Sequence, residues 1–193
     1  MLKSVFIALL VYLIVHIPNV LAKEIDLSNM SDPSGIYEIA LCARPSPDAP
    51  LNLPGHAFVS FTHIKHNGDV TLTSIGHTTD ADAISALNSY FGDPVAGYLG
   101  KEKYTSSMQQ CLRIKVNKDD YDSAFGLTAS PMEQLGLAGN SDLVLRSYAL
   151  SENDCITFMV EVADVLKPLG LNVPVRGSTE LPLKYMERLI RSN

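Results

Sequence analysis

Short stretches in which apolar and polar residues alternate occupy the first two thirds of the chain and predict β-strands. These stretches are 36–43, 56–64, 69–77 and 111–116. Apolar residues at helical spacing predict helices over about 79–90, 119–125 and 180–192, and over a segment that starts at 151–153 and stops at Gly170. The pattern marks 23–34 as a polar lead-in and assigns no element to 128–147. A block of strands with a helix behind it predicts an α+β domain, an antiparallel sheet packed against helices.

The first residues have the pattern of a cleaved secretory signal. Lys3 precedes an almost unbroken apolar run over 5–17, and the small residue Ala22 ends the segment. The alternative is a retained membrane anchor, but the run is short for a span and is followed by polar residues. We therefore expect a signal peptide over 1–22, cleaved after Ala22, and a single secreted or periplasmic domain over 23–193 without stable membrane insertion.

Charge and cysteine content narrow the partners and the compartment. The chain has 15 Lys and Arg against 21 Asp and Glu, a formal net charge of −6, which argues against nucleic acid or an anionic membrane surface as the main partner. Three cysteines leave at least one thiol outside any intramolecular disulfide. Cys42 and Cys111 both lie on the less apolar face of their predicted strands, so they could form a disulfide if these strands are neighbours. The alternative is two unpaired small hydrophobic residues.

Cys155 is the candidate nucleophile. It follows Ser151-Glu152-Asn153-Asp154, a polar approach that contains helix-capping residues and places the thiol near solvent at a helix start. The helix dipole and a nearby imidazolium both favour the thiolate, which is the reactive form. A buried, inert thiol is the alternative.

The hairpin predicted at Asn67-Gly68 brings two histidines together. A two-residue turn places His77 opposite Phe58, so His56 becomes its diagonal neighbour on the same face, at roughly 5–8 Å. One imidazole could then act as a base and the other could orient it. The alternative is a hydrogen-bonded pair in a half-buried sheet.

The two remaining histidines of the hairpin do not suggest a metal site. On a strand, the side chains of His63 and His66 point to opposite faces, and no second ligand pair has suitable spacing. We therefore expect solvated hairpin side chains and neither a metal nor a cofactor.

These motifs together resemble the permuted branch of the NlpC-type papain-like cysteine hydrolases. The resemblance rests on Gly55-His56-Ala57-Phe58-Val59, on Ile75-Gly76-His77, and on Tyr148-x-Leu150-x-x-Asn153-Asp154-Cys155-Ile156-Thr157-Phe158. It implies a papain-like fold in which the histidine strand precedes the cysteine helix. It also implies Cys155 as nucleophile, His56 as general base and acid, and His77 as the group that orients His56. Many relatives have Asn directly before the cysteine, whereas Asp154 here opposes thiolate formation.

The resulting hypothesis is a cysteine peptidase or amidase that cleaves an amide bond through an acyl-enzyme, with a peptide of the bacterial cell wall as a candidate substrate. The backbone N–H of Cys155, and more weakly Tyr148, are the candidate oxyanion donors. Two alternatives stay open. One is a lipid acyltransferase or thioesterase of the same fold, which an apolar groove near Cys155 would support. The other is a catalytically silent binding domain.

Overall fold

The computed structural model describes residues 22–29, 31–46, 54–102, 109–129 and 144–193. Its strands are β1 (Ala22–Asp26), β2 (Ile36–Arg44), β3 (His56–Ile64), β4 (Val70–Thr78), β5 (Val95–Lys101), β6 (Gln110–Val116) and β7 (Val144–Tyr148). They form one seven-stranded sheet in the order β1-β6-β2-β3-β4-β5-β7. Neighbouring strands are antiparallel except β1 and β6, which are parallel. The predicted α+β class is confirmed.

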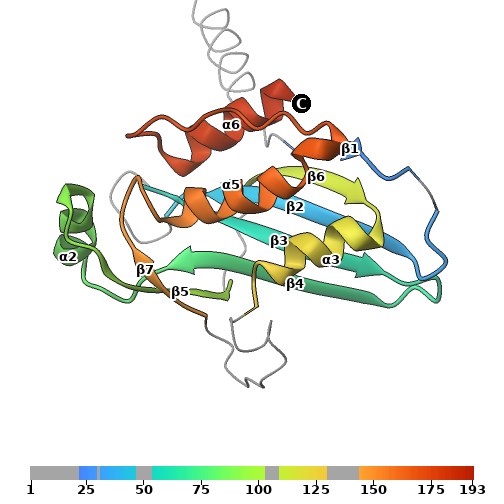
Figure 1. Ribbon diagram of the computed structural model, residues 1–193, viewed down its shortest axis with the longest axis horizontal. Coiled ribbons are helices and arrows are strands. Elements are labelled where there is room, and N and C mark those ends of the chain that lie inside the picture. Colours follow the sequence, from blue (N-terminus) through green and yellow to red (C-terminus); the bar gives the residue numbers. More distant parts are fainter. Residues whose placement is uncertain (1–21, 30, 47–53, 103–108, 130–143) are drawn as a thin grey trace, which may run out of the picture.

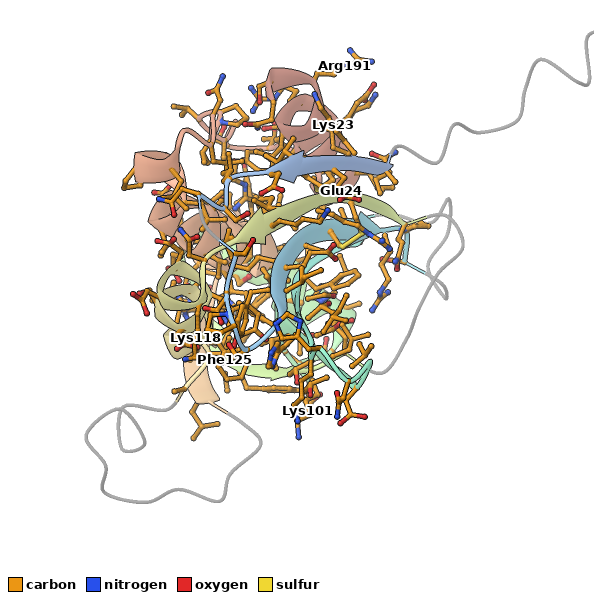
Figure 2. All side chains as sticks on the ribbon, turned by 90° about the vertical axis from the view of Figure 1, so that its right-hand side faces the viewer. Lys23, Glu24, Lys101, Lys118, Phe125 and Arg191 are labelled. Carbon is orange, nitrogen blue, oxygen red and sulfur yellow. A yellow bond between two sulfur atoms is a disulfide. The ribbon has the colours of Figure 1, made fainter. Side chains whose placement is uncertain are left out.

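The main helices cover one face of this sheet. The helices are α2 (Ala83–Asn88), α3 (Lys118–Gly126), α5 (Cys155–Val165) and α6 (Pro182–Ser192). Figure 1 shows α3, α5 and α6 lying across the strands, with α2 set apart at one end of the sheet. In Figure 2, turned by 90°, Lys118 and Phe125 mark α3 at the left of the strands, and Arg191 marks α6 at the top. Phe61, Leu112 and Phe158 are fully buried between sheet and helices, so the main core lies there.

Local chemistry explains where the helices begin and end. The Asp82 side chain caps α2 by accepting hydrogen bonds from two backbone N–H groups, and Pro182 occupies the first turn of α6, where no N–H is needed. Gly92 and Gly170 have positive φ angles of 101° and 105°, which lets the chain leave the helical segments that precede them. The predicted starts and stops therefore agree with the structure to within a few residues.

Three strands lie where the pattern predicted none. β1 forms within the segment taken as a polar lead-in, and β7 lies at the end of 128–147. The sequence of β5 includes Gly97 and Gly100 and has no clear alternation of apolar and polar residues. A Cβ at Gly97 would come within 2.7 Å of Cβ of Tyr148 on β7, so this glycine allows close pairing. The neighbouring strands, more than side-chain alternation, specify these elements.

The disulfide prediction is confirmed. β2 pairs directly with β6, and Cys42 stands opposite Cys111 in that register, with a Cα–Cα distance of 4.2 Å. The bridge lies on the sheet face away from α5, where it packs with Ala40 and Phe58. Matching strand parity was therefore a sufficient signal once the two strands proved to be neighbours.

The predicted hairpin register is wrong by one residue. Lys65 pairs with Asp69 through a hydrogen bond of 2.9 Å, so the loop is three residues long and ends at Gly68, whose φ is 89°. Such loops place a glycine in the left-handed region before the second strand. An Asn-Gly pair fits both turn lengths, and a shift of one residue moves every side chain of β4 to the other face relative to the predicted pairing.

The expected signal peptide falls almost entirely on residues 1–21, which lie outside the described part of the chain. Ala22, its last residue, is the first residue of β1 and pairs with Cys111. Within the described ranges, no helix is long and apolar enough to cross a membrane.

Candidate active site

Cys155 is the first residue of α5, and the preceding cap explains this position. The Asp154 side chain accepts hydrogen bonds from the backbone N–H groups of Ile156 and Thr157, which fixes the start of the helix. The backbone N–H of Cys155 takes no part in these two hydrogen bonds. The thiol therefore stands at the positive end of the helix dipole.

The turn before the helix holds one residue in an unusual conformation. Ser151 has a φ of 71°, in the left-handed region that non-glycine residues rarely adopt. Its N–H donates a hydrogen bond of 2.9 Å to the Asp154 carboxylate, and Ala149 and Asn153 pair across the turn. These hydrogen bonds hold the strained turn and aim the chain into α5.

His56 begins β3 at the end of the sheet where β3 and β4 separate. Pairing between these strands ends at Val59 and Ile75, although β3 stays paired with β2 as far as His56. The His56 ring interacts with the Cys155 thiol on the α5 side, which raises the pKa of His56, and its Nε2 lies 2.7 Å from Oε1 of Glu102 on the other side. The ring therefore occupies the opening between the two strands and links the thiol to a carboxylate.

These contacts determine the charge of His56. Burial alone would lower the pKa of His56, but the hydrogen bonds to Cys155 and Glu102 outweigh burial and raise this pKa to about 9. Burial alone would also raise the pKa of Glu102, whereas His56 and Arg44 lower it below its usual value. At neutral pH the structure therefore favours an imidazolium between the thiol and an ionised carboxylate.

Glu102 is the site residue that the sequence did not reveal. It directly follows β5, and its backbone N–H donates a hydrogen bond of 2.8 Å to the carbonyl of Ser74 in β4. Its second carboxylate oxygen accepts a hydrogen bond of 3.1 Å from Nη2 of Arg44. No motif surrounds it, because its place beside His56 depends on the pairing of β4 with β5.

Gly76 makes room for this pair of side chains. A Cβ at Gly76 would lie 2.5 Å from Nε2 of His56 and would collide with Oε1 of Glu102. Only glycine therefore fits opposite the imidazole. The direction of this absent Cβ also shows that His56 and Glu102 lie on the face of β4 opposite to the side chain of His77.

His77 is not placed to orient His56. It pairs with Leu99 of β5, faces α5, and contacts the ring of Tyr148 edge-on at 5.2 Å. It is fully buried, and neither ring nitrogen has a hydrogen-bond partner within the described residues. Burial and the Arg146 guanidinium lower the pKa of His77 to about 4, so it is neutral at physiological pH. The one-residue register shift separates the two histidines that the sequence analysis placed together.

A pocket of about 320 Å³ opens beside Cys155. Only 5% of Cys155 is exposed, less than its polar approach suggested, and it contributes to the wall of this pocket. Half of the lining residues are apolar or aromatic: Pro54, Leu87, Tyr90, Tyr148, Leu150, Ile156, Leu181 and Pro182. The polar part of the wall includes Asp154, Arg176 and Glu180. Burial and the nearby Cys155 raise the pKa of Tyr148, which keeps its hydroxyl protonated and able to donate a hydrogen bond.

The carboxylate next to Cys155 is neutralised by a second residue that the sequence did not reveal. Arg176 binds Asp154 with both guanidinium nitrogens, Nη1 to Oδ1 and Nη2 to Oδ2, each at 2.7 Å. The opposition to thiolate formation expected from Asp154 is therefore countered by a bidentate ion pair.

The other two histidines of the β3–β4 hairpin have structural contacts. His63 stacks on Tyr37 with ring centroids 4.3 Å apart, and Nε2 of His66 lies 3.3 Å from the backbone oxygen of Asp32. No group of three or more His, Cys, Asp or Glu side chains able to hold a metal ion occurs in the described parts of the chain.

Comparison of the chain with family models, with curated proteins and with solved structures finds no match in any of the three.

Proposed function

We propose that the protein is a cysteine hydrolase that attacks an amide or ester carbonyl and passes through an acyl-enzyme. Cys155 is the nucleophile, His56 the general acid and base, and Glu102, in place of His77, the group that orients His56. One observation carries the proposal: the His56 ring contacts the thiol at a helix N-terminus on one side and a buried carboxylate on the other.

The proton movements follow from this arrangement. His56 holds the proton released by Cys155, and the thiolate attacks the carbonyl carbon of the substrate. The imidazolium then donates its proton to the leaving nitrogen or oxygen, the bond to this atom breaks, and a thioester remains on Cys155. His56 next removes a proton from water, the hydroxide attacks the thioester, and the acid leaves as His56 returns the proton to sulfur. Glu102 keeps the ring oriented throughout.

Two donors are available for the oxyanion that forms at the carbonyl. The N–H of Cys155 lies at the helix N-terminus outside the Asp154 cap, and Tyr148, whose hydroxyl can donate, lines the pocket beside Cys155. The negative charge that develops in the transition state is then stabilised by one backbone group and one side chain.

A secreted or periplasmic location fits the disulfide, which is typical of oxidising compartments. In such a compartment of a bacterium, a cell-wall peptide is an accessible amide substrate. A second candidate substrate is an acyl ester or thioester with an apolar acyl group, because leucine, isoleucine, proline and tyrosine side chains form half of the lining of the pocket beside Cys155.

Labelling by iodoacetamide tests the proposal without knowledge of the substrate. Cys155 in the folded chain should react faster than a free-cysteine peptide at neutral pH, and His56→Ala should slow this reaction at least tenfold. His63→Ala serves as the control, since His63 lies in the same strand but stacks on Tyr37. Equal labelling rates for the wild type and His56→Ala would overturn the proposal.

The substrate class is tested by hydrolysis. Peptide anilides and p-nitrophenyl esters with acyl chains of increasing length should separate the two candidates, and Cys155→Ser should abolish turnover of whichever is cleaved. Rates that rise with acyl chain length would favour the ester or thioester substrate. Cleavage of the peptides with no gain from chain length would favour the amide.

A further inference from the structure

We propose that Arg176 is a positioning residue for the nucleophile: it neutralises and fixes Asp154, so that a buried carboxylate can stand next to the Cys155 thiolate. This inference rests on the proposed function, because it assigns a role to a residue that acts through the same site.

The ion pair is better formed and more buried than a surface pair. Both carboxylate oxygens of Asp154 accept a guanidinium N–H at 2.7 Å, and only 2% of the Asp154 side chain and 15% of the Arg176 side chain are exposed. Such fork-shaped pairs fix geometry as well as charge. Arg176 therefore fixes the orientation of the Asp154 carboxylate as well as compensating its charge.

Asp154 is held from several directions at once. Besides Arg176, it binds the N–H groups of Ile156 and Thr157 as the helix cap, and the N–H of Ser151 across the strained turn. The residue before the nucleophile is thus locked in place. The carboxylate that does this also brings a negative charge beside the sulfur, and such a charge disfavours a thiolate unless a cation compensates it.

The charged and titratable groups around Cys155 and Asp154 come from five elements. His56 lies in β3, His77 in β4, Tyr148 in β7, Asp154 at the start of α5, and Arg176 and Glu180 in the irregular segment 173–181. Glu102 and Arg44 stand behind His56. His56 is already ion-paired with Glu102, whereas Arg176 is ion-paired with Asp154.

The segment 173–181, which we call the strap, offers a matched control. Arg188 of α6 ties the strap through the backbone oxygen of Val175 and the carboxylate of Glu180. Arg176 ties the same strap to Asp154 and hence to the start of α5. Loss of either arginine loosens the strap and removes one carboxylate's partner. Loss of Arg188 leaves Glu180 in the strap itself, whereas loss of Arg176 leaves the carboxylate of Asp154, the residue directly before Cys155.

The test is the pH profile of iodoacetamide labelling at Cys155 in the folded full chain. Arg176→Gln should move the midpoint upward by about one pH unit, so that labelling below the midpoint is about tenfold slower. Arg188→Gln should leave the midpoint unchanged. Arg176→Lys keeps the positive charge, and Asp154→Asn combined with Arg176→Gln removes both charges, so these two variants should return the midpoint to near the wild-type value.

Equal profiles for Arg176→Gln and Arg188→Gln would overturn the inference, as would a double variant that stays shifted. If Arg176→Gln does not fold, Arg176→Lys and the double variant still test the inference. A labelling midpoint far from the wild-type value in either of them would overturn it. The outcome for the proposed function is separate. If His56→Ala leaves the labelling rate of Cys155 unchanged while Arg176→Gln lowers it, the proposed hydrolase function is wrong, but the electrostatic role of Arg176 still holds.

Discussion

Glu102→Gln tests the link between the carboxylate and the imidazole most directly, because it removes one charge and keeps the side-chain shape. In the wild type, Oε1 of Glu102 lies 2.7 Å from Nε2 of His56, and the pKa of His56 is raised to about 9. Arg44 binds the other carboxylate oxygen. After the substitution, Arg44 faces an uncharged amide, so its positive charge further disfavours the imidazolium.

The expected change in the pKa of His56 follows from its hydrogen bond with Glu102. A hydrogen bond to a charged partner contributes about 1.5–3 kcal/mol, and about 1.4 kcal/mol corresponds to one pKa unit, so the pKa of His56 should fall from about 9 to about 7–8. The direction in which stability changes with pH follows from the same pKa. A raised folded-state pKa stabilises the fold below pH 6.5, the usual histidine value, and this contribution is lost as the pH rises through about 9. In Glu102→Gln the loss should occur at lower pH.

The measurement is an NMR titration of the His56 ring, together with unfolding by urea at several pH values. Glu24→Gln is the control, because Glu24 is also an ion-paired carboxylate of this sheet but lies on the edge strand, paired with Lys115. A titration curve of His56 that is the same in Glu102→Gln and Glu24→Gln would refute the coupling between Glu102 and His56.

Three further predictions follow from the packing. Gly76→Ala should displace His56, cost about 1–3 kcal/mol by overpacking, and abolish rapid iodoacetamide labelling; retained labelling in a circular-dichroism-verified fold would contradict this. His77→Phe should remove acid sensitivity: a folded-state pKa of about 4, below the usual 6.5, means that stability is lost as the pH falls from about 6.5 towards 4, at a cost of about 3 kcal/mol. Urea unfolding at pH 7 and pH 4.5 measures this, and an equal pH dependence in wild type and variant would disprove it. Replacing Cys42 and Cys111 by alanine should cost about 2–5 kcal/mol in unfolding experiments, since the bridge closes a long loop; an unchanged unfolding midpoint would count against that estimate.

Much of the local structure could be predicted from the sequence, because it depends on groups only a few residues apart. Side-chain alternation located β2, β3, β4 and β6, and the parity of Cys42 and Cys111 within two of these strands predicted the disulfide. The start of α5 was predicted to within a few residues, although Asp154, and not Ser151 or Asn153, caps the helix. The position of Cys155 at this helix start is therefore a local property.

The assembly of the candidate site depended on contacts across the sheet. The same Asn-Gly pair allows loops of two or three residues, and only the pairing of β3 with β4 selected the longer one, which turned His77 away from His56. Glu102 and Arg176 carry no sequence signal, because Glu102 reaches His56 from β5 across β4, and Arg176 reaches Asp154 from a segment without regular structure. Strand register and long-range charge pairing are set when the whole chain packs, and no short window of the sequence contains both partners.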